Sequence, residues 1–451
     1  MAETSRRNVL RAGAAALAGF AGGSNLGGRK KVEAHQPATG KASKWDHEYT
    51  FGHTQLFMEE YLQGTLDILG KQSGEIEHVG ELAIRAASVV RNGGTVWTSM
   101  DLGHMPHYEQ NESRRGSPGI MKDHRDFNKL KKGDMVFTHR ANRDVLAARE
   151  RGVYVVCVTS NYHDNEFRPK GFTDPSHGNP DGLMLKDVSN DVLHSHNPYT
   201  QGLVHAPEIP EFAICPSSTT GSGTIHWMIN AGLAAQLKNR DNRPGAYIER
   251  YLRILTERVE SVRQHLSLIR ETAVEMTHRI RSGGRWFARS IEHKGFETEF
   301  HVASGVRVVN HGDWNANKER NVMLINAISP AFKEEVKLAL EKQVEGALVI
   351  GIGPSNLDGR KPYGPLIDIA DVGFDNFSPE SGGVIDLAPY EGGICPTSGI
   401  VGNVIQQMIV AQWCDEMVRR GSRPYFLMGV YQEGGSEYNA ATKILFERQG
   451  F

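Results

Sequence analysis

The chain has 451 residues, a formal net charge of −2 and 23% charged residues. Its length indicates two or three domains, and a hydrophobic content of 39% is enough to form buried cores. A nearly neutral chain carries no strong field of either sign, which excludes binding to nucleic acid or to a membrane surface through net charge alone.

The first residues differ from the rest of the chain. Arg6 and Arg7 follow Ser5, and a weakly apolar run of Ala, Gly and Leu extends to Gly23. This pattern resembles a twin-arginine export signal. The run is shorter than the ~20 apolar residues that span a bilayer. We therefore predict an export signal over residues 1–34, no stable membrane span and a periplasmic or exported protein, with a cytoplasmic location as the alternative.

Helices alternate with buried strands along both halves of the chain. Helical spacing of apolar residues ends at Gly93 and Gly94, and buried strands are predicted at 95–99, 134–139 and 153–160. In the second half, predicted strands at 321–326 and 347–353 enclose a helix at 330–343. Continuously apolar strands separated by helices are typical of parallel sheets that are covered on both faces.

One motif occurs twice, as ICPSSTTGSG from Ile214 and as ICPTSGIVGN from Ile394. The residues that follow each copy align without a gap, and the helix around Leu82 aligns with the one around Thr272. The first copy must hold extra residues, and we place them in a Pro- and Gly-rich insertion at 163–182. The sequence therefore predicts a tandem repeat.

The segments ADVGFDNFSPESG, ICPTSGIVGNVIQQMIVAQW and YQEGGSEYN, in this order after the alternating strands and helices, resemble the sugar isomerase (SIS) domain family. The likeness is greatest to small phosphosugar-binding members and covers nearly the whole mature chain. The tandem arrangement is similar to the isomerase half of glucosamine-fructose-6-phosphate aminotransferase. The resemblance implies two SIS domains, at 45–250 and 251–451, each a flavodoxin-like αβα sandwich with a five-stranded parallel sheet.

The same resemblance implies the partners of the protein. We expect a small-molecule ligand, either a sugar or a sugar phosphate, and no nucleic acid. Sites in this family often form between domains or subunits, so we also expect a homodimer.

Both copies of the motif are predicted to lie between a strand and a helix, where doubly wound sheets bind ligands. Small hydroxyl side chains at a helix start suit phosphate, carboxylate or sugar hydroxyls. The predicted substrate-binding residues are Ser217, Ser218, Thr219, Thr397, Ser398, Arg140 and His196. Plain helix capping is the alternative. Because the first copy keeps more hydroxyls, we expect it to be the more polar site.

The sequence departs from the family pattern after the second strand of each domain. The family has a phosphate loop rich in Ser and Thr there, whereas this chain has THRANRD from Thr138 and NAISPAF from Asn326. We place Glu334 and Glu335 more than a turn into the following helix and transfer no acidic role to them.

An aldose–ketose isomerase needs a base beside the carbonyl carbon and an acid at the carbonyl oxygen, and Glu and His suit both tasks. The predicted catalytic residues are His104, Glu109, His293 and Glu437, with no cofactor and no metal. The spacing of His104 and His107 beside Glu109 leaves a metal site as an open alternative. The predicted function is a sugar or phosphosugar isomerase; the alternatives are a non-catalytic carbohydrate-binding or sensing protein and a structural subunit.

Overall fold

A computed structural model describes residues 56–100, 104–159, 182–240, 243–355, 364–379, 382–430, 432 and 434–451. The predicted export signal and nearly all of the predicted insertion lie outside these ranges. Among the described residues, no helix has both the length and the apolar character needed to cross a membrane. Below, "first half" means described residues up to 240 and "second half" means those from 243.

The first half forms a parallel sheet with strand order β2-β1-β3-β4-β5. Its strands are β1 (Val96–Ser99), β2 (Lys122–Asp123), β3 (Met135–Thr138), β4 (Tyr154–Val158) and β5 (Asp191–Leu193). Helices α5 (Arg143–Glu150) and α6 (Leu185–Val188) lie between successive strands from β3 onward. Because every strand pair is parallel, the carboxyl ends of all five strands lie at one edge.

The second half forms a parallel sheet with strand order β11-β10-β9-β8. Its strands are β8 (Trp286–Arg289), β9 (Val322–Asn326), β10 (Leu348–Gly353) and β11 (Val372–Asp375), connected in part by α10 (Lys333–Val344) and α11 (Leu366–Ile369). This sheet has four strands rather than the five expected, because the segment beside β8 makes only a single bridge, between Trp286 and Val309.

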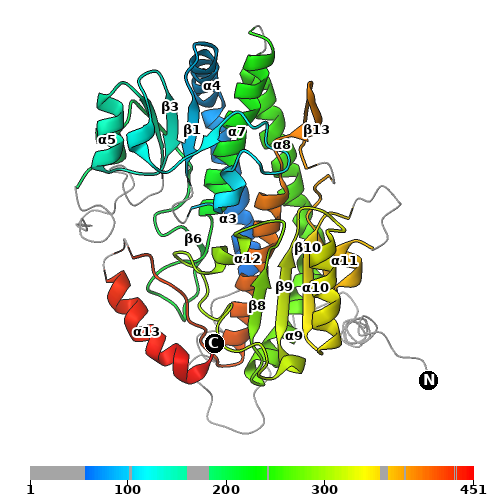
Figure 1. Cartoon of the computed structure of the whole chain (residues 1–451). Helices are drawn as coiled ribbons and strands as arrows, with labels where there is room; N and C mark the ends of the chain where they lie inside the picture. The colour runs from blue at the N-terminus through cyan, green and yellow to red at the C-terminus, as the bar shows by residue number, and fades with distance from the viewer. Residues whose placement is uncertain are drawn as a thin grey trace, which may run out of the picture.

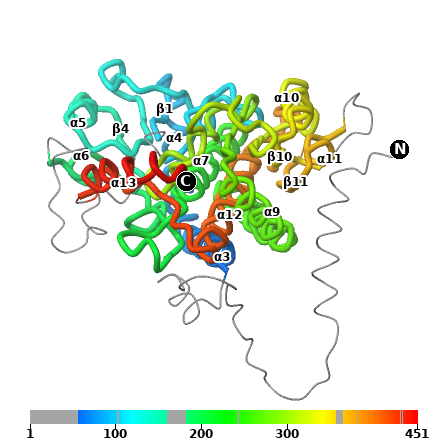
Figure 2. The backbone as a smooth tube through the Cα atoms, turned by 90° about the horizontal axis from the view of Figure 1, so that it is seen from below, coloured from blue at the N-terminus to red at the C-terminus, as the bar shows by residue number. Residues whose placement is uncertain are grey.

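Two long helices, α7 (Ser218–Lys238) and α12 (Ser398–Arg419), form the centre of the molecule between the two sheets (Figures 1 and 2). Both are buried around almost their whole circumference, which is the pattern of a core helix rather than of a surface helix. Their side chains belong to one apolar core that also includes strand residues of both sheets. Separate apolar clusters under α5 and α6 and under α10 and α11 cover the outer faces. The predicted three-layer α/β fold is confirmed.

Two pairs of helices surround the central pair. They are α3 (Phe57–Gln72) with α4 (Ile76–Arg91), joined by η1 (Ser73–Glu75), and α8 (Pro244–Ser261) with α9 (Leu266–Arg281), joined by η4 (Val262–His265). Helix α3 of the first half packs on α12, and α8 of the second half packs on α7. Each half therefore contributes a helix to the core of the other. The boundary predicted between residues 250 and 251 falls inside α8.

The remaining elements are short or peripheral. They are the antiparallel pairs β6 (Gly202–Val204) with β7 (Ile214–Pro216) and β12 (Ile385–Leu387) with β13 (Tyr390–Ile394), the turns η2 (His107–Gln110), η3 (Phe127–Lys129), η5 (Phe296–Phe300) and η6 (Lys318–Arg320), and the C-terminal helix α13 (Gly435–Gln449). Strands β7 and β13 lead directly into α7 and α12, so the two copies of the repeated motif stand at equivalent strand-to-helix junctions.

Candidate functional site

Each copy of the repeated motif is attached to a loop of the opposite half. Cys215 and Cys395 have left-handed backbone conformations, with φ of 63° and 59°. Residues other than glycine rarely adopt this conformation. The backbone N–H of Cys215 donates to the carbonyl of Ser304, and that of Cys395 donates to the carbonyl of Gly116, both at 2.8 Å. The strained conformation therefore directs each motif to the other half of the chain.

At the next residue, each motif is also held by a tyrosine of its own half. The Tyr61 hydroxyl on α3 donates to the carbonyl of Pro216 at 2.9 Å, and the Tyr251 hydroxyl on α8 donates to the carbonyl of Pro396 at 3.1 Å. Both tyrosines are fully buried. A buried carbonyl without a partner costs free energy, so these bonds stabilise both junctions in the same way.

The hydroxyl side chains of the two motifs do not cap their helices and do not face solvent. Ser217 donates to the carbonyl of Gln201 at 2.9 Å, and Thr397 contacts Arg258 and Ser378. Neither makes a capping hydrogen bond, although each occupies the N-cap position. All five predicted hydroxyl residues are buried, and the Oγ of Ser218 has no hydrogen-bond partner among the described residues. The hydroxyl side chains of both motifs therefore lie inside the junction between the two halves, and their predicted role in ligand binding stays a prediction.

Glu109 lies at the centre of the second junction, where the motif copy that begins at Ile394 leads into α12. Its carboxylate accepts from Nε of Arg114 at 3.0 Å and from Nε1 of Trp227 at 2.8 Å, and it lies 3.6 Å from Nε2 of His293. Arg114 also donates to Ser398 Oγ at 2.9 Å. Burial by itself raises the pKa of Glu109, but Arg114, with His293 and Trp227, outweighs it and lowers the pKa to about 2. Glu109 is therefore an ionised, fully paired carboxylate.

His293 is held in the same cluster as a neutral ring. It is fully buried, its Nδ1 lies 3.2 Å from Oδ1 of Asn326, and its Nε2 lies 3.2 Å from Nη2 of Arg114. Burial, and then the positive charge of Arg114, lower the pKa of His293 despite the nearby carboxylate. The structure thus brings together two of the predicted catalytic residues, Glu109 and His293, in a closed ionic network.

Glu299 occupies the corresponding place at the first junction. It lies on η5, as Glu109 lies on η2, and it accepts a hydrogen bond from Thr219 of α7. Burial raises its pKa to about 7, and only the Thr219 hydroxyl opposes this. The two junctions are therefore unequal, as expected, but the charge is concentrated at the second junction rather than at the first.

The difference between the two motif sequences has a steric cause. A Cβ atom at Gly399 would lie 2.6 Å from Oε2 of Glu109, so only glycine admits the carboxylate there. The aligned residue in the first motif is Thr219, whose side chain instead reaches Glu299. SST in the first copy and TSG in the second therefore suit two different glutamate environments.

A pair of histidines lies at the carboxyl edge of the first sheet. His104 is in the loop that follows β1, and His139 directly follows β3. Their rings make an edge-to-face contact with centroids 4.8 Å apart, and they are 6% and 1% exposed. His104 Nδ1 lies 2.8 Å from Nε2 of Gln201, and His139 Nδ1 lies 2.8 Å from the carbonyl of Val158. Sequence analysis missed His139, Arg114 and Trp227.

The other predicted residues have contacts outside these clusters. His196 Nε2 is 2.9 Å from Oε1 of Glu75, and the guanidinium carbon of Arg140 is 5.9 Å from the ring centre of Phe127. Glu437 is exposed in the first turn of α13, and this helix lies at the periphery of the molecule in Figure 1. The structure does not bring Glu437 to the other candidates.

The described residues contain no group of three or more His, Cys, Asp or Glu side chains arranged to hold a metal ion. The spacing of His104 and His107 had left a metal site as an alternative, but these two histidines have different partners. His107 Nε2 lies 2.9 Å from Oδ2 of Asp123, whereas His104 contacts Gln201.

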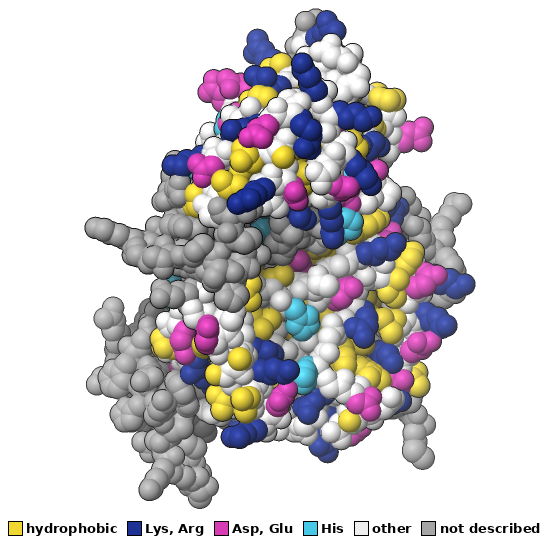
Figure 3. Space-filling view, turned by 60° about the vertical axis from the view of Figure 1, so that its left-hand side comes forward, with side chains coloured by type: hydrophobic (Ala, Val, Ile, Leu, Met, Phe, Trp, Pro, Cys, Tyr) yellow, Lys and Arg dark blue, Asp and Glu magenta, His cyan; other side chains and the backbone are white. Residues whose placement is uncertain are grey.

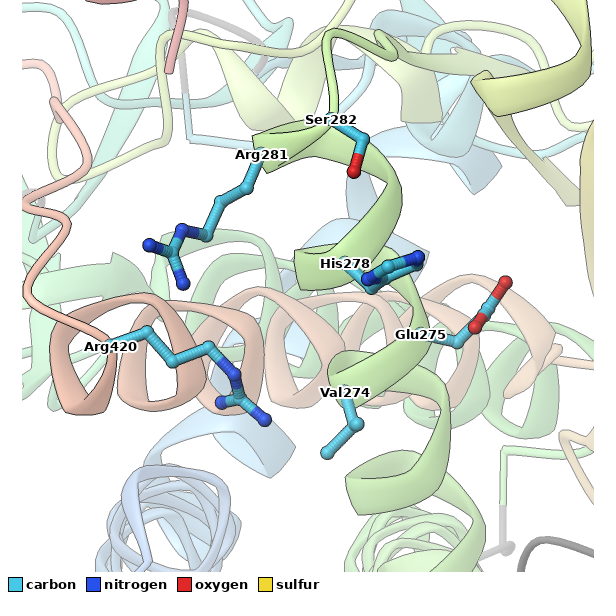
Figure 4. A pocket seen from close by; sticks show the side chains of 6 residues that line it. All are labelled: Val274, Glu275, His278, Arg281, Ser282 and Arg420. Atoms are coloured by element: carbon cyan, nitrogen blue, oxygen red, sulfur yellow. The ribbon is translucent and has the colours of Figure 1, made fainter. Parts of the chain in front are cut away.

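An open surface hollow lies where α9 ends, beside the end of α12 (Figure 4). It is lined by Val274, Glu275, His278, Arg281, Ser282 and Arg420. None of the predicted site residues lines it, and it lies at helix ends rather than at the carboxyl edge of a sheet. Basic and acidic side chains are interspersed over the face shown in Figure 3, in keeping with the small net charge.

The sequence matches no protein-family model, and no curated protein matches it significantly. Among solved structures, it is similar to a candidate phosphosugar isomerase from Silicibacter pomeroyi, with 13% identity, a TM-score of 0.43, and 82% of this chain and 100% of that chain covered. A candidate sugar-binding protein from Salmonella typhimurium has 10% identity and a TM-score of 0.43, covering 77% of this chain and 98% of its own. The C-terminal domain of glucosamine-fructose-6-phosphate aminotransferase from Francisella tularensis has 10% identity and a TM-score of 0.39, covering 80% and 97%. Values this low assign no activity to the chain.

The environment of Glu299 predicts a pH-dependent stability. Its folded pKa of about 7 lies above the ordinary value of 4.5, so the folded state binds this proton more tightly than the unfolded state does. The resulting stabilisation is present below about pH 4.5 and is lost as pH rises through about 7. Glu299→Gln keeps an acceptor for Thr219 and removes the charge. We expect its free energy of unfolding to exceed the wild type by on the order of 3 kcal/mol at about pH 8, with little difference near pH 4.

Denaturant unfolding at both pH values measures this difference. Glu297→Gln, at a partly exposed neighbouring residue, is the matched control, and its free energy of unfolding should not differ from the wild type in this pH-dependent way. If the free energy of unfolding of Glu299→Gln exceeded that of the wild type by the same amount at both pH values, Glu299 would not be protonated in the native state near neutral pH.

Proposed function

We propose that this chain is a tandem SIS-domain protein that binds a sugar or sugar phosphate at the carboxyl edge of the first sheet and isomerises it by proton transfer. The observation that carries the proposal is the contact between His104 and His139 at that edge. Ligands of open α/β sheets bind beyond the carboxyl ends of the strands. The two rings come from the loops after adjacent strands, β1 and β3.

The hydrogen bonds of the two rings suit them to opposite tasks. The carbonyl of Val158 can only accept, so His139 carries its proton on Nδ1 and has a lone pair on Nε2. The amide of Gln201 donates to His104 Nδ1, which leaves the proton of His104 on Nε2. His139 is therefore the base for the proton on the carbon next to the carbonyl, and His104 is the acid at the carbonyl oxygen. His139 then returns its proton to the former carbonyl carbon, and the hydroxyl on the neighbouring carbon gives its proton back to His104, which forms the new carbonyl and restores both rings.

We assign Glu109 and His293 to the junction rather than to the chemistry. Glu109 is already paired with Arg114 and Trp227, and it is fully buried. A carboxylate with a pKa lowered to about 2 is a poor base near neutral pH. The tandem SIS organisation itself is supported by the equivalent positions of Tyr61 and Tyr251 and of Glu109 and Glu299.

A second candidate function is binding without turnover. It is favoured by the burial of both histidines, because a group that must move protons needs access to substrate. The loops THRANRD and NAISPAF, which lack the Ser- and Thr-rich run of the family's phosphate loop, also favour binding without turnover.

Replacing the two histidines separates these candidates. We expect His139→Gln and His104→Gln each to lower deuterium exchange at the carbon next to the substrate carbonyl at least about 100-fold, because each removes one proton-transfer group. Ligand-induced thermal shifts should change little. Exchange is measured by mass spectrometry in heavy water across aldoses, ketoses and their phosphates.

The matched control is His205→Gln, at an exposed histidine that contacts Glu60. Wild-type exchange that survives both substitutions would contradict the assignment. A wild-type protein that binds a sugar of the panel without any exchange would favour the binding function instead.

We also propose that the protein is exported through its twin arginines. Changing Arg6 and Arg7 to Lys keeps the positive charge and removes the arginine pair, so the protein should accumulate in the cytoplasm. Cell fractionation followed by immunoblotting measures this. Unaltered export of the double Lys variant would refute the proposal.

A further inference from the structure

The C-terminal helix α13 is fixed to the rest of the chain through one face. Phe446 is buried, and its ring makes an edge-to-face contact with His311, with centroids 4.6 Å apart. Asn439 Oδ1 accepts the backbone N–H of Met428 at 3.0 Å, and Asn439 Nδ2 donates to the carbonyl of Met428 at 2.8 Å. These contacts hold the helix in one position and leave its opposite face at the surface of the molecule (Figure 1).

The opposite face, here called the outer face of α13, is apolar at its centre. Its residues lie within about 140° of one another around a helix of about 3.6 residues per turn. All of them are exposed, and they are Glu437, Ala440, Ala441, Ile444, Leu445 and Arg448. Ile444 is 55% exposed and Leu445 is 45% exposed. Single apolar residues on a surface are ordinary, whereas a contiguous apolar patch with charges at its rim is typical of an interaction surface.

Opposite charges lie at the two ends of the outer face. Glu437 is in the first turn of α13, and Arg448 is in the last turn. Neither charged side chain makes an ion pair or a hydrogen bond within the described part of the chain. Both charges are therefore available to a partner that covers the apolar centre between them.

The order of residues along the outer face makes it complementary to itself. Glu437 and Arg448 are equally far from the point midway between residues 442 and 443, and so are Ala441 and Ile444. When two copies of α13 pack antiparallel about a two-fold axis at this point, Glu437 of each copy lies opposite Arg448 of the other. The small side chain of Ala441 then leaves room for Ile444 of the second copy, so that the helices can approach closely.

We propose that the outer face of α13 is a self-association surface, on which a second copy of this chain packs its own α13 in antiparallel orientation. Burial of Ile444 and Leu445 of both copies removes apolar surface from water, and the two symmetry-related ion pairs fix the register. A partner of one charge sign fits less well, because the outer face has one charge of each sign. The surface belongs to neither sheet edge, so its role is separate from the proposed isomerisation.

The size of the outer face determines the strength of this association. A 15-residue helix is about 22 Å long. A contact of this length between two helices buries less than the total of about 1,600 Å² that is usual for a stable complex. The dimer is therefore reversible, and its population depends on protein concentration.

Sedimentation-velocity ultracentrifugation of the full chain over a range of concentrations tests the proposal. We expect the wild type to be a dimer that dissociates on dilution, with a Kd in the micromolar range. Ile444→Glu places two like charges at the centre of the interface and should weaken association at least about 100-fold. Because Ile444 is exposed in the single chain, the circular dichroism spectrum and the unfolding of the diluted, monomeric protein should match those of the wild type.

Charge reversal tests the antiparallel register. Glu437→Arg and Arg448→Glu each bring like charges together at both ends of the interface, so each should weaken association by about tenfold. The double variant restores opposite charges with their signs exchanged, and it should associate within about threefold of the wild type. Only an arrangement that places Glu437 of one copy opposite Arg448 of the other predicts this recovery.

Val344→Glu is the matched control, because Val344 is an exposed apolar residue on α10 and lies outside the proposed surface. This substitution should leave the Kd within about twofold of the wild type. A wild type that stays a monomer at every concentration would overturn the proposal, as would a dimer that survives Ile444→Glu. Charge variants that do not compensate each other would also overturn it, because the antiparallel register requires their recovery.

Discussion

A buried ion pair, Arg114 with Glu109, determines how the two halves of this protein fit together. Both side chains are fully buried, and Arg114 extends from Glu109 to Ser398 at the start of α12. Removing two charges from water is costly unless every donor and acceptor is satisfied. Trp227 and His293 provide the remaining contacts. The loop after β1 can therefore hold only one position against the second half.

This constraint separates structural from chemical roles. Glu109 and His293, which were predicted as catalytic residues from the sequence, both form part of the junction. The groups that remain at a sheet edge are His104 and His139 on the first sheet and, on the second, Glu292, which accepts hydrogen bonds from Ser329. One edge thus presents two imidazole rings, of which one faces an amide nitrogen and the other a backbone carbonyl, whereas the other edge presents donors that already hold a carboxylate. The two sheets therefore present two different surfaces.

The alternation of strands and helices could be predicted because it depends on neighbouring residues. The apolar runs around Val155 and Val349 are buried strands, and Gly93 follows the end of α4 with a positive φ. The repeat also located both junctions correctly. It did not reveal that Ser217 and Thr397 would be buried, because that depends on which surface of the other half covers them.

The partners of the candidate residues could not be predicted for the same reason. Trp227 lies 118 positions from Glu109, and Ser398 lies 284 positions from Arg114. No local pattern connects such residues. For Glu437 a local pattern was present, because its motif resembled a functional segment. In the structure, however, its side chain is exposed at the start of α13. Only Gly399 gave a local signal, since a glycine replaces the Thr of the first copy where a carboxylate approaches.

The most direct test of the junction is a double-mutant cycle on Arg114 and Glu109, read as the free energy of unfolding in denaturant. Arg114→Met leaves a buried carboxylate without its cation and should cost about 3–5 kcal/mol. Adding Glu109→Gln should recover most of this loss, whereas the exposed pair Arg253 and Glu257, changed in the same way, should show coupling below about 1 kcal/mol. Additive effects of the two junction substitutions would contradict the account, because they would mean that Arg114 and Glu109 do not act as a coupled buried pair.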